Sequence, residues 1–188
     1  MKLICVHGVD GDEVIYYLRP DTALLRNNAP FYYPDFTAQL VARVCAVVRV
    51  CRLGRSIGSR FAARYYDAVG AGVTFTAADL LARDVAEEKP WDRAVSFDYS
   101  AAVSREFIGM DKWRESRYDM RACSEGEIPL AMENIQVVDK IIEYVSNFMT
   151  LKIGDYIFIP ASPPFQVNTG HHIETFFMDK KMLDVAIK

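Results

Sequence analysis

LVARVCAVVRVCR (residues 40–52) is the clearest strand in the sequence, because β-branched valine runs through it and a glycine, Gly54, follows its end. Side chains in a strand point alternately to two faces. One face is wholly apolar and is expected in the core: Ala42, Val44, Ala46, Val48 and Val50. The other face carries Arg43, Cys45 and Arg49 among valines. The alternation therefore predicts a strand with one core face and one face available for a site.

The segments on either side of residues 40–52 are short, and most of them also have strand character. We expect further strands at residues 2–6, 14–17, 95–98, 103–107, 156–160, 172–177 and 182–187. Helical spacing of apolar residues predicts the best helix at 135–148, and Thr76 is a candidate N-cap for a second helix at 77–87. Residues 19–34 are expected to form an irregular loop, and 110–118 a charged, exposed segment. The fold class predicted is mixed α/β, mostly β, with few short helices.

Bulk properties exclude several classes of protein. A chain of 188 residues, half of it hydrophobic, is expected to form a single domain over residues 1–188. A formal net charge of −3 argues against a nucleic-acid or anionic-membrane surface. No apolar run reaches the roughly 18 residues that a membrane span needs. Four cysteines without CxxC spacing, and an N-terminus unlike a signal peptide, predict a cytoplasmic protein with reduced thiols.

Four longer motifs carry a family resemblance. They are PFYYPDFTAQL (30–40), FTAADLLARD (75–84), PWDRAVSFDYSA (90–101) and YVSNFMTLKIGDYIF (144–158). Together they resemble short, single-domain members of the fumarylacetoacetate hydrolase family. The resemblance implies that family's β-roll fold and a homodimer. The last motif is the most specific and carries no chemistry, so it bears on the fold more than on the function.

The resemblance also implies a chemistry. Family members bind Mg²⁺ or Mn²⁺ through a Glu-x-Glu pair and an Asp, since hard cations prefer carboxylate oxygens. The metal polarises a 2-oxo or dicarbonyl acid for C–C hydrolysis, isomerisation or decarboxylation. In this chain the Glu-x-Glu pair falls on Arg43 and Cys45, the Asp falls on Thr74, and the catalytic lysine falls on Val95. Asp98 of the family's Phe-Asp pair persists.

An error of register does not restore the missing ligands, because residues 36–60 contain no Asp or Glu. We therefore predict no metal cofactor and a catalytically degenerate family member. Arg43 in place of a metal ligand predicts a fixed positive charge that holds a small carboxylate or other anion. Cys45 and Asp98 are further candidate contacts for that anion. The alternatives are a solvated Arg43 on a half-exposed strand face and a packed, unreactive Cys45 thiol.

Two other functions remain open from the sequence. One is an active, divergent hydrolase or isomerase of the family, with relocated ligands at Asp79, Asp98 or Glu106 or a metal-free mechanism built on Arg43. The other is a structural or partner-binding homodimer module that uses the aromatic cluster at 31–33. The pair His172 and Glu174 would share a strand face, but no third ligand is identifiable, so we expect a surface turn there rather than a metal site.

Overall fold

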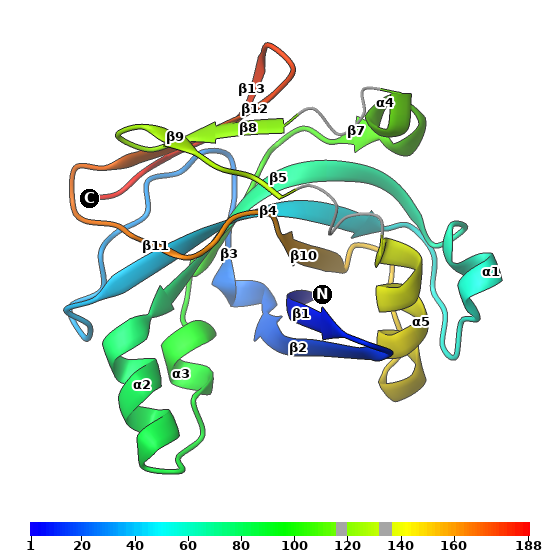
Figure 1. The fold of residues 1–188 in the computed structure, drawn as a ribbon, viewed down its shortest axis with the longest axis horizontal. Helices are drawn as coiled ribbons and strands as arrows, with labels where there is room; N and C mark the ends of the chain where they lie inside the picture. The colour runs from blue at the N-terminus through cyan, green and yellow to red at the C-terminus, as the bar shows by residue number, and fades with distance from the viewer. Residues whose placement is uncertain (116–119, 132–136) are drawn as a thin grey trace.

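The computed structural model describes residues 1–115, 120–131 and 137–188, and Figure 1 shows two β-sheets with helices around them. The large sheet has the strand order β2-β1-β10-β4-β5-β6-β3, with β11 beside β4 and β7 beside β5. Its strands are β1 (Lys2–Asp10), β2 (Glu13–Pro20), β3 (Leu24–Leu25), β4 (Leu40–Val50), β5 (Tyr66–Ala77), β6 (Ala101–Val103), β7 (Ile108–Gly109), β10 (Tyr156–Pro160) and β11 (Phe165–Gln166).

The smaller sheet has the order β13-β12-β8-β9. Its strands are β8 (Met120–Cys123), β9 (Glu127–Ile128), β12 (His172–Phe177) and β13 (Lys180–Ala186). The helices are α1 (Ser59–Ala62), α2 (Ala78–Ala86), α3 (Asp92–Val95), α4 (Met110–Glu115) and α5 (Val138–Phe148), with a 3-10 turn at Asp21–Ala23. The described residues hold more strand than helix, so the predicted mixed α/β, mostly β fold class is confirmed. No described helix combines the length and the apolar character needed to cross a bilayer.

β4 lies at the centre of the large sheet, between β10 and the long partner strand β5, as the valine-rich pattern predicts. Its predicted core face is confirmed, since Ala42, Val44 and Val48 pack into the main apolar cluster with residues of α5 and of the smaller sheet. The opposite face is less exposed than the sequence suggests. Cys45 and Val47 are 2% and 0% exposed and join a second cluster with β1, β6 and β10.

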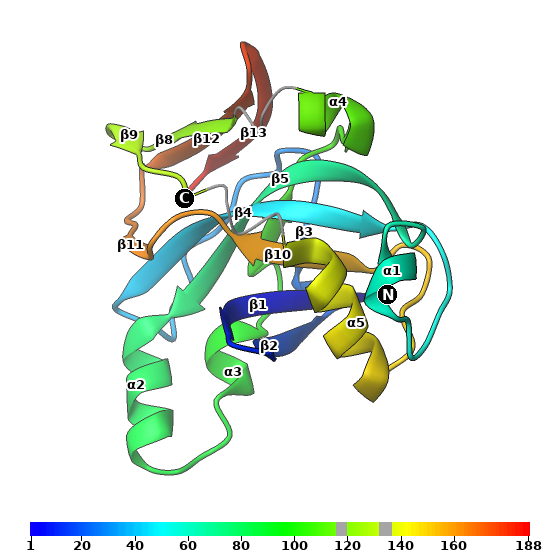
Figure 2. The same ribbon diagram turned by 45° about the vertical axis from the view of Figure 1, so that its right-hand side comes forward.

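Gly72 of β5 permits the close packing of that second cluster. A Cβ atom added at this position would lie 2.5 Å from Val47 Cγ2 and 2.8 Å from the ring of Phe158. Residue 72 therefore has no room for a side chain while β4 and β10 hold their present positions. In both views α2 and α3 stand together on the side of β4 and β5 away from the smaller sheet (Figures 1 and 2).

Several local predictions were wrong. Val95 does not begin a strand but ends the short helix α3, because the chain must turn back from α2 to β6 within a few residues. The strand expected at 103–107 ends at Val103. Ser104 then breaks the pairing, since its hydroxyl accepts a hydrogen bond from Ala71 N and donates one to Glu106 O. Thr76 is not the N-cap: β5 continues to Ala77, and Ala77 is the N-cap residue that precedes α2.

Two segments expected to be exposed or irregular carry buried side chains. β2 continues through Arg19, which is 1% exposed, so the expected loop begins later than residue 19. Trp113 of α4 is 2% exposed and stacks on Phe177 at a centroid distance of 5.2 Å, so segment 110–118 is not simply a solvated surface. Residues 116–118 of that segment and the first residues of the predicted helix at 135–148 lie outside the described part of the chain.

Candidate functional site

A cavity of about 500 Å³ lies against the face of the large sheet that carries the second cluster. Its walls come from β1, β2, β4, β5 and β10 and from the α2–α3 region, and most of its lining residues are apolar. Four of the five positions singled out from the sequence line it: Arg43, Cys45, Thr74 and Val95. The fifth, Asp98, is exposed and does not line the cavity. Strand pairing of β4 with β5 and the position of α3 thus bring together residues that are up to 52 positions apart in the chain.

The three positions that the resemblance assigns to metal ligands are neighbours in the sheet. Arg43 of β4 lies directly opposite Thr74 of β5 in the antiparallel register. The Cys45 sulfur lies 3.9 Å from the Thr74 hydroxyl oxygen. The backbone arrangement for three converging side chains is therefore present, which supports the carry-over of residues along both strands.

The side chains at these positions do not fit a hard divalent cation. Mg²⁺ and Mn²⁺ are held by carboxylate and carbonyl oxygens. Here the three side chains are a guanidinium, a thiol and a hydroxyl. Burial raises the pKa of Cys45 to about 12, with the nearby Cys5 adding to the rise, so the thiol stays protonated at neutral pH. No group of three or more His, Cys, Asp or Glu side chains in the described parts of the chain is placed to hold a metal ion.

Arg43 brings a positive charge to the cavity without a counter-charge. Within the described part of the chain, no carboxylate forms an ion pair with its guanidinium. Arg49, six residues further along the same face of β4, differs in this respect. Its Nε and Nη2 atoms donate to Asp67 over 2.9 and 2.8 Å. Arg43 is therefore the arginine of β4 that is available to an anion from solution.

Sequence reasoning missed two residues of this region, Tyr17 and Arg19. Tyr17 lines the cavity, and Arg19 lies beside it in the interior. Arg19 Nη1 donates to Phe75 O over 3.0 Å and to Ser100 O over 2.5 Å, while Nη2 donates to the Tyr17 hydroxyl over 3.1 Å. The alternation of the strand at 14–17, continued by two residues, would have placed both side chains on one face.

The carboxylates considered as relocated ligands are all elsewhere. Asp79 accepts hydrogen bonds from the Thr37 hydroxyl and from Ala38 N, which fastens α2 to the loop before β4. Glu106 pairs with Lys180 of β13. Neither these two side chains nor Asp98 line the cavity. None of the three carboxylates proposed as relocated metal ligands, Asp79, Asp98 and Glu106, therefore lies in the cavity.

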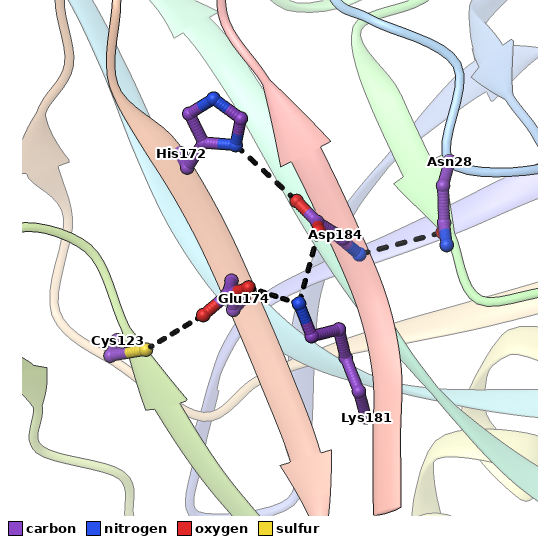
Figure 3. Close-up of polar contacts among 6 residues, drawn as sticks. All are labelled: Asn28, Cys123, His172, Glu174, Lys181 and Asp184. Carbon is purple, nitrogen blue, oxygen red and sulfur yellow. Dashed lines mark hydrogen bonds and ion pairs between the residues drawn. The ribbon is translucent and has the colours of Figure 1, made fainter.

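Figure 3 shows the polar cluster around His172 and Glu174 on the smaller sheet. Lys181 lies between two carboxylates: it pairs with Glu174 and lies 3.1 Å from Asp184. His172 Nδ1 lies 3.4 Å from the other oxygen of Asp184. Because a lysine already occupies the space between the carboxylates, the cluster is an ion-pair network on a largely exposed surface, and a metal has no place in it.

Comparisons with known proteins agree with this architecture. No model of a known protein family matches the chain. The mitochondrial oxaloacetate tautomerase FAHD1 of Bos taurus is 30% identical over 159 residues, which are 77% of this chain and 67% of the relative. The mitochondrial oxaloacetate decarboxylase of Dictyostelium discoideum is 26% identical over 150 residues, 77% of this chain and 68% of the relative.

Solved structures share the fold over the full length of the chain. A fumarylacetoacetate hydrolase family protein from Yersinia pestis superposes with a TM-score of 0.85 at 23% identity, covering 100% of this chain and 92% of that one. Fumarylpyruvate hydrolase from Pseudomonas aeruginosa, solved with Mn²⁺ and pyruvate, gives a TM-score of 0.83 at 18% identity, covering 100% and 89%. The 30% identical relative and the shared architecture together show that the chain belongs to the fumarylacetoacetate hydrolase family.

Proposed function

We propose that this chain is a family member that has lost the metal-dependent reaction and binds a small carboxylate in the cavity through Arg43. The observation that carries the proposal is the guanidinium of Arg43, which lines the cavity beside Cys45 and Thr74 and faces no carboxylate of the described residues. A guanidinium binds carboxylate through paired, charge-assisted hydrogen bonds. A positive charge at this place also repels Mg²⁺ and Mn²⁺.

The walls of the cavity limit the ligand further. Ile15, Leu81, Trp91 and Val95 supply apolar surface around the polar positions. A ligand with an acidic end and an apolar body buries that body while its charge is neutralised. The solved relative from Pseudomonas aeruginosa holds pyruvate together with Mn²⁺, which supports a carboxylate as the class of ligand. In this chain the charge of the metal would be replaced by a fixed side-chain charge.

The test is carboxylate binding in the presence of EDTA, measured by thermal melting and calorimetry with pyruvate, oxaloacetate and heptanoate as probes. The expected result is stabilisation of the wild type by at least one probe, and an affinity about tenfold to a hundredfold weaker in Arg43→Gln. This range corresponds to the loss of a hydrogen bond to a charged group. Arg49→Gln is the matched control, because it removes an arginine from the same strand face outside the cavity and should keep the wild-type affinity.

The proposal is wrong if no carboxylate binds, or if Arg43→Gln binds as tightly as the wild type. Stoichiometric binding of Mn²⁺ to the wild type at the Arg43 region would also contradict it. In that case the lost-metal part of the proposal fails even if a carboxylate binds.

A second candidate is metal-free proton transfer on a 2-oxo acid. It is favoured by the 30% identity to a tautomerase and by His7, an exposed histidine of β1 that lines the cavity and offers ring nitrogens for proton exchange. Oxaloacetate tautomerisation by the wild type, lost in His7→Gln and in Arg43→Gln, would select this candidate. The homodimer, the single domain and the cytoplasmic location remain predictions.

A further inference from the structure

Tyr17 is a fixed side chain in the wall of the cavity. Its ring meets Trp91 edge-on at a centroid distance of 5.6 Å, and the Arg19 guanidinium lies 5.4 Å from the ring centroid. Its hydroxyl accepts a hydrogen bond from Arg19 Nη2 over 3.1 Å. A guanidinium has no acceptor atom. The hydroxyl proton of Tyr17 must therefore point away from Arg19 and is available to another group.

The group that faces this hydroxyl within the protein is a weak acceptor. Cys5 lies directly opposite Tyr17 in the register of β1 and β2, and its thiol also lines the cavity. Burial raises the pKa of Cys5, so the sulfur is a protonated thiol. Thiol sulfur accepts hydrogen bonds poorly in comparison with a carbonyl or carboxylate oxygen. A ligand oxygen would therefore accept the hydrogen bond of the Tyr17 hydroxyl in preference to the Cys5 sulfur.

Arg19 fixes the position of the Tyr17 hydroxyl from the protein interior and brings a positive charge there. It is 1% exposed, and two backbone carbonyls, Phe75 O and Ser100 O, fix its Nη1 atom. Its Nε atom is buried, and no residue that the structure describes accepts a hydrogen bond from it. No carboxylate of the described residues acts on Arg19; besides the two carbonyls, its polar neighbours are Tyr17, Cys5 and Cys45. A buried positive charge without a counter-ion favours electron-rich atoms in the adjacent cavity.

Tyr17 and Arg43 line the cavity from two different strands. In the order β2-β1-β10-β4, two strands lie between theirs. Phe158 of β10 and Cys45 of β4 occupy the floor between them. A ligand that contacts both residues therefore needs a second polar group besides its carboxylate, with apolar atoms between the two.

We infer that Tyr17 is the specificity-determining contact of the cavity: it donates a hydrogen bond to a ligand oxygen at the end away from Arg43, and Arg19 is its positioning residue. The ligand class is a carboxylate with a second oxygen acceptor away from the carboxylate group. This inference rests on the proposed function, since Arg43 must hold the carboxylate. It adds a second polar contact that the resemblance to the family does not assign.

The experiment compares pairs of probes that differ only in the far oxygen: 4-oxopentanoate with pentanoate, and 6-oxoheptanoate with heptanoate. Dissociation constants are measured by titration followed by NMR, in EDTA. The wild type should bind the oxo acid of at least one pair about five to ten times more tightly than its alkanoate, the range of one neutral hydrogen bond. Tyr17→Phe should reduce this ratio to about one.

Two further variants separate a specific role from a structural one. Tyr156→Phe removes a tyrosine hydroxyl from the same sheet outside the cavity, where its ring stacks on Phe107, and should keep the wild-type ratio. Arg19→Met should lose the preference for the oxo acid over its alkanoate. Arg19→Lys, which keeps a charge and a donor, should retain part of that preference. If Arg19→Met does not fold, the affinity ratio measured for Tyr17→Phe alone decides whether Tyr17 sets the preference.

The outcomes distinguish this inference from the proposed function. If the wild type binds the oxo acids and the alkanoates equally, or if Tyr17→Phe keeps the preference, the role of Tyr17 is wrong while the carboxylate site stands. If none of the four probes nor those of the previous experiment bind, the proposed function fails and this inference fails with it.

Discussion

At the scale of single residues, burial decides what the cavity side chains can do. Cys45 and Cys5 both line the cavity, yet both are 2% exposed. The charge of Arg43 lowers the pKa of Cys45, but burial raises it more, to about 12. The thiol is thus a poor nucleophile at neutral pH, because the thiolate is the reactive form. The packed-thiol alternative fits this geometry better than a reactive cysteine does.

We expect Cys45 to resist alkylation by iodoacetamide at pH 8, where a thiol with a pKa of about 12 has roughly one molecule in ten thousand ionised. Its labelling rate should rise about tenfold for each pH unit up to that pKa. The partly buried Cys51 and Cys123 serve as internal references and should react first. Peptide mass mapping checks the order. Labelling of Cys45 at the rate of Cys51 at pH 8 would show that the cavity ionises this thiol.

At the scale of elements, β4 is a strand with two buried faces of different character. Val44, at 0% exposed, belongs to the wholly apolar core. Cys45 is buried beside polar groups, since its sulfur lies 3.6 Å from Arg43 O and 3.9 Å from the Thr74 hydroxyl. A polar atom is therefore tolerated on one face of the strand and not on the other.

Val44→Asp should destabilise the protein by several kcal/mol, because it places a carboxylate in an apolar core without a partner. Cys45→Ser should cost about 1 kcal/mol, since the new hydroxyl has polar neighbours with which to hydrogen-bond. Urea denaturation of both variants measures the difference. Similar small shifts in the two midpoints would mean that the faces of β4 are assigned the wrong way round.

At the scale of the whole molecule, the chain keeps the family fold, and the proposed function places a fixed side-chain charge at its centre. The structure superposes on a Mn²⁺-containing relative over its full length with a TM-score of 0.83. The paired strands β4 and β5 still bring Arg43, Cys45 and Thr74 together. The proposed change of function therefore needs no change of backbone, only of the side chains on two strands.

The triple variant Arg43→Glu, Cys45→Glu and Thr74→Asp tests whether those strands can still hold a metal. With Mn²⁺ at a hundredfold excess over its dissociation constant, binding should stabilise the fold by about 2.7 kcal/mol. Without metal, three close carboxylates should repel one another and lower the melting temperature. Melting curves with and without Mn²⁺ check both effects. Catalytic activity should stay poor because Val95 supplies no ammonium group. The absence of a metal-dependent shift would mean that the carried-over positions do not converge as the register indicates.

Elements with a local pattern are predictable from the amino-acid sequence alone. The alternation in residues 40–50 and the helical spacing before Phe148 depend only on which face of each element is apolar, and both were read correctly. The motifs further identified the family and the positions Arg43, Cys45, Thr74 and Val95, which the structure gathers around one cavity.

The other features depend on contacts between segments that are distant in the sequence, so they become visible in the folded chain. The strand predicted at Val95 became a helix, since the chain had to return from α2 to β6. Asp98 lies outside the cavity, and the motif could not show this because it gives the identity of the residue and not the residues that pack around it. Arg19 was read as part of a loop, and its burial appears only when Phe75, Ser100 and Tyr17 meet around it. Periodicity determines the face of a strand from which a side chain projects, whereas packing between strands determines which residues that side chain contacts.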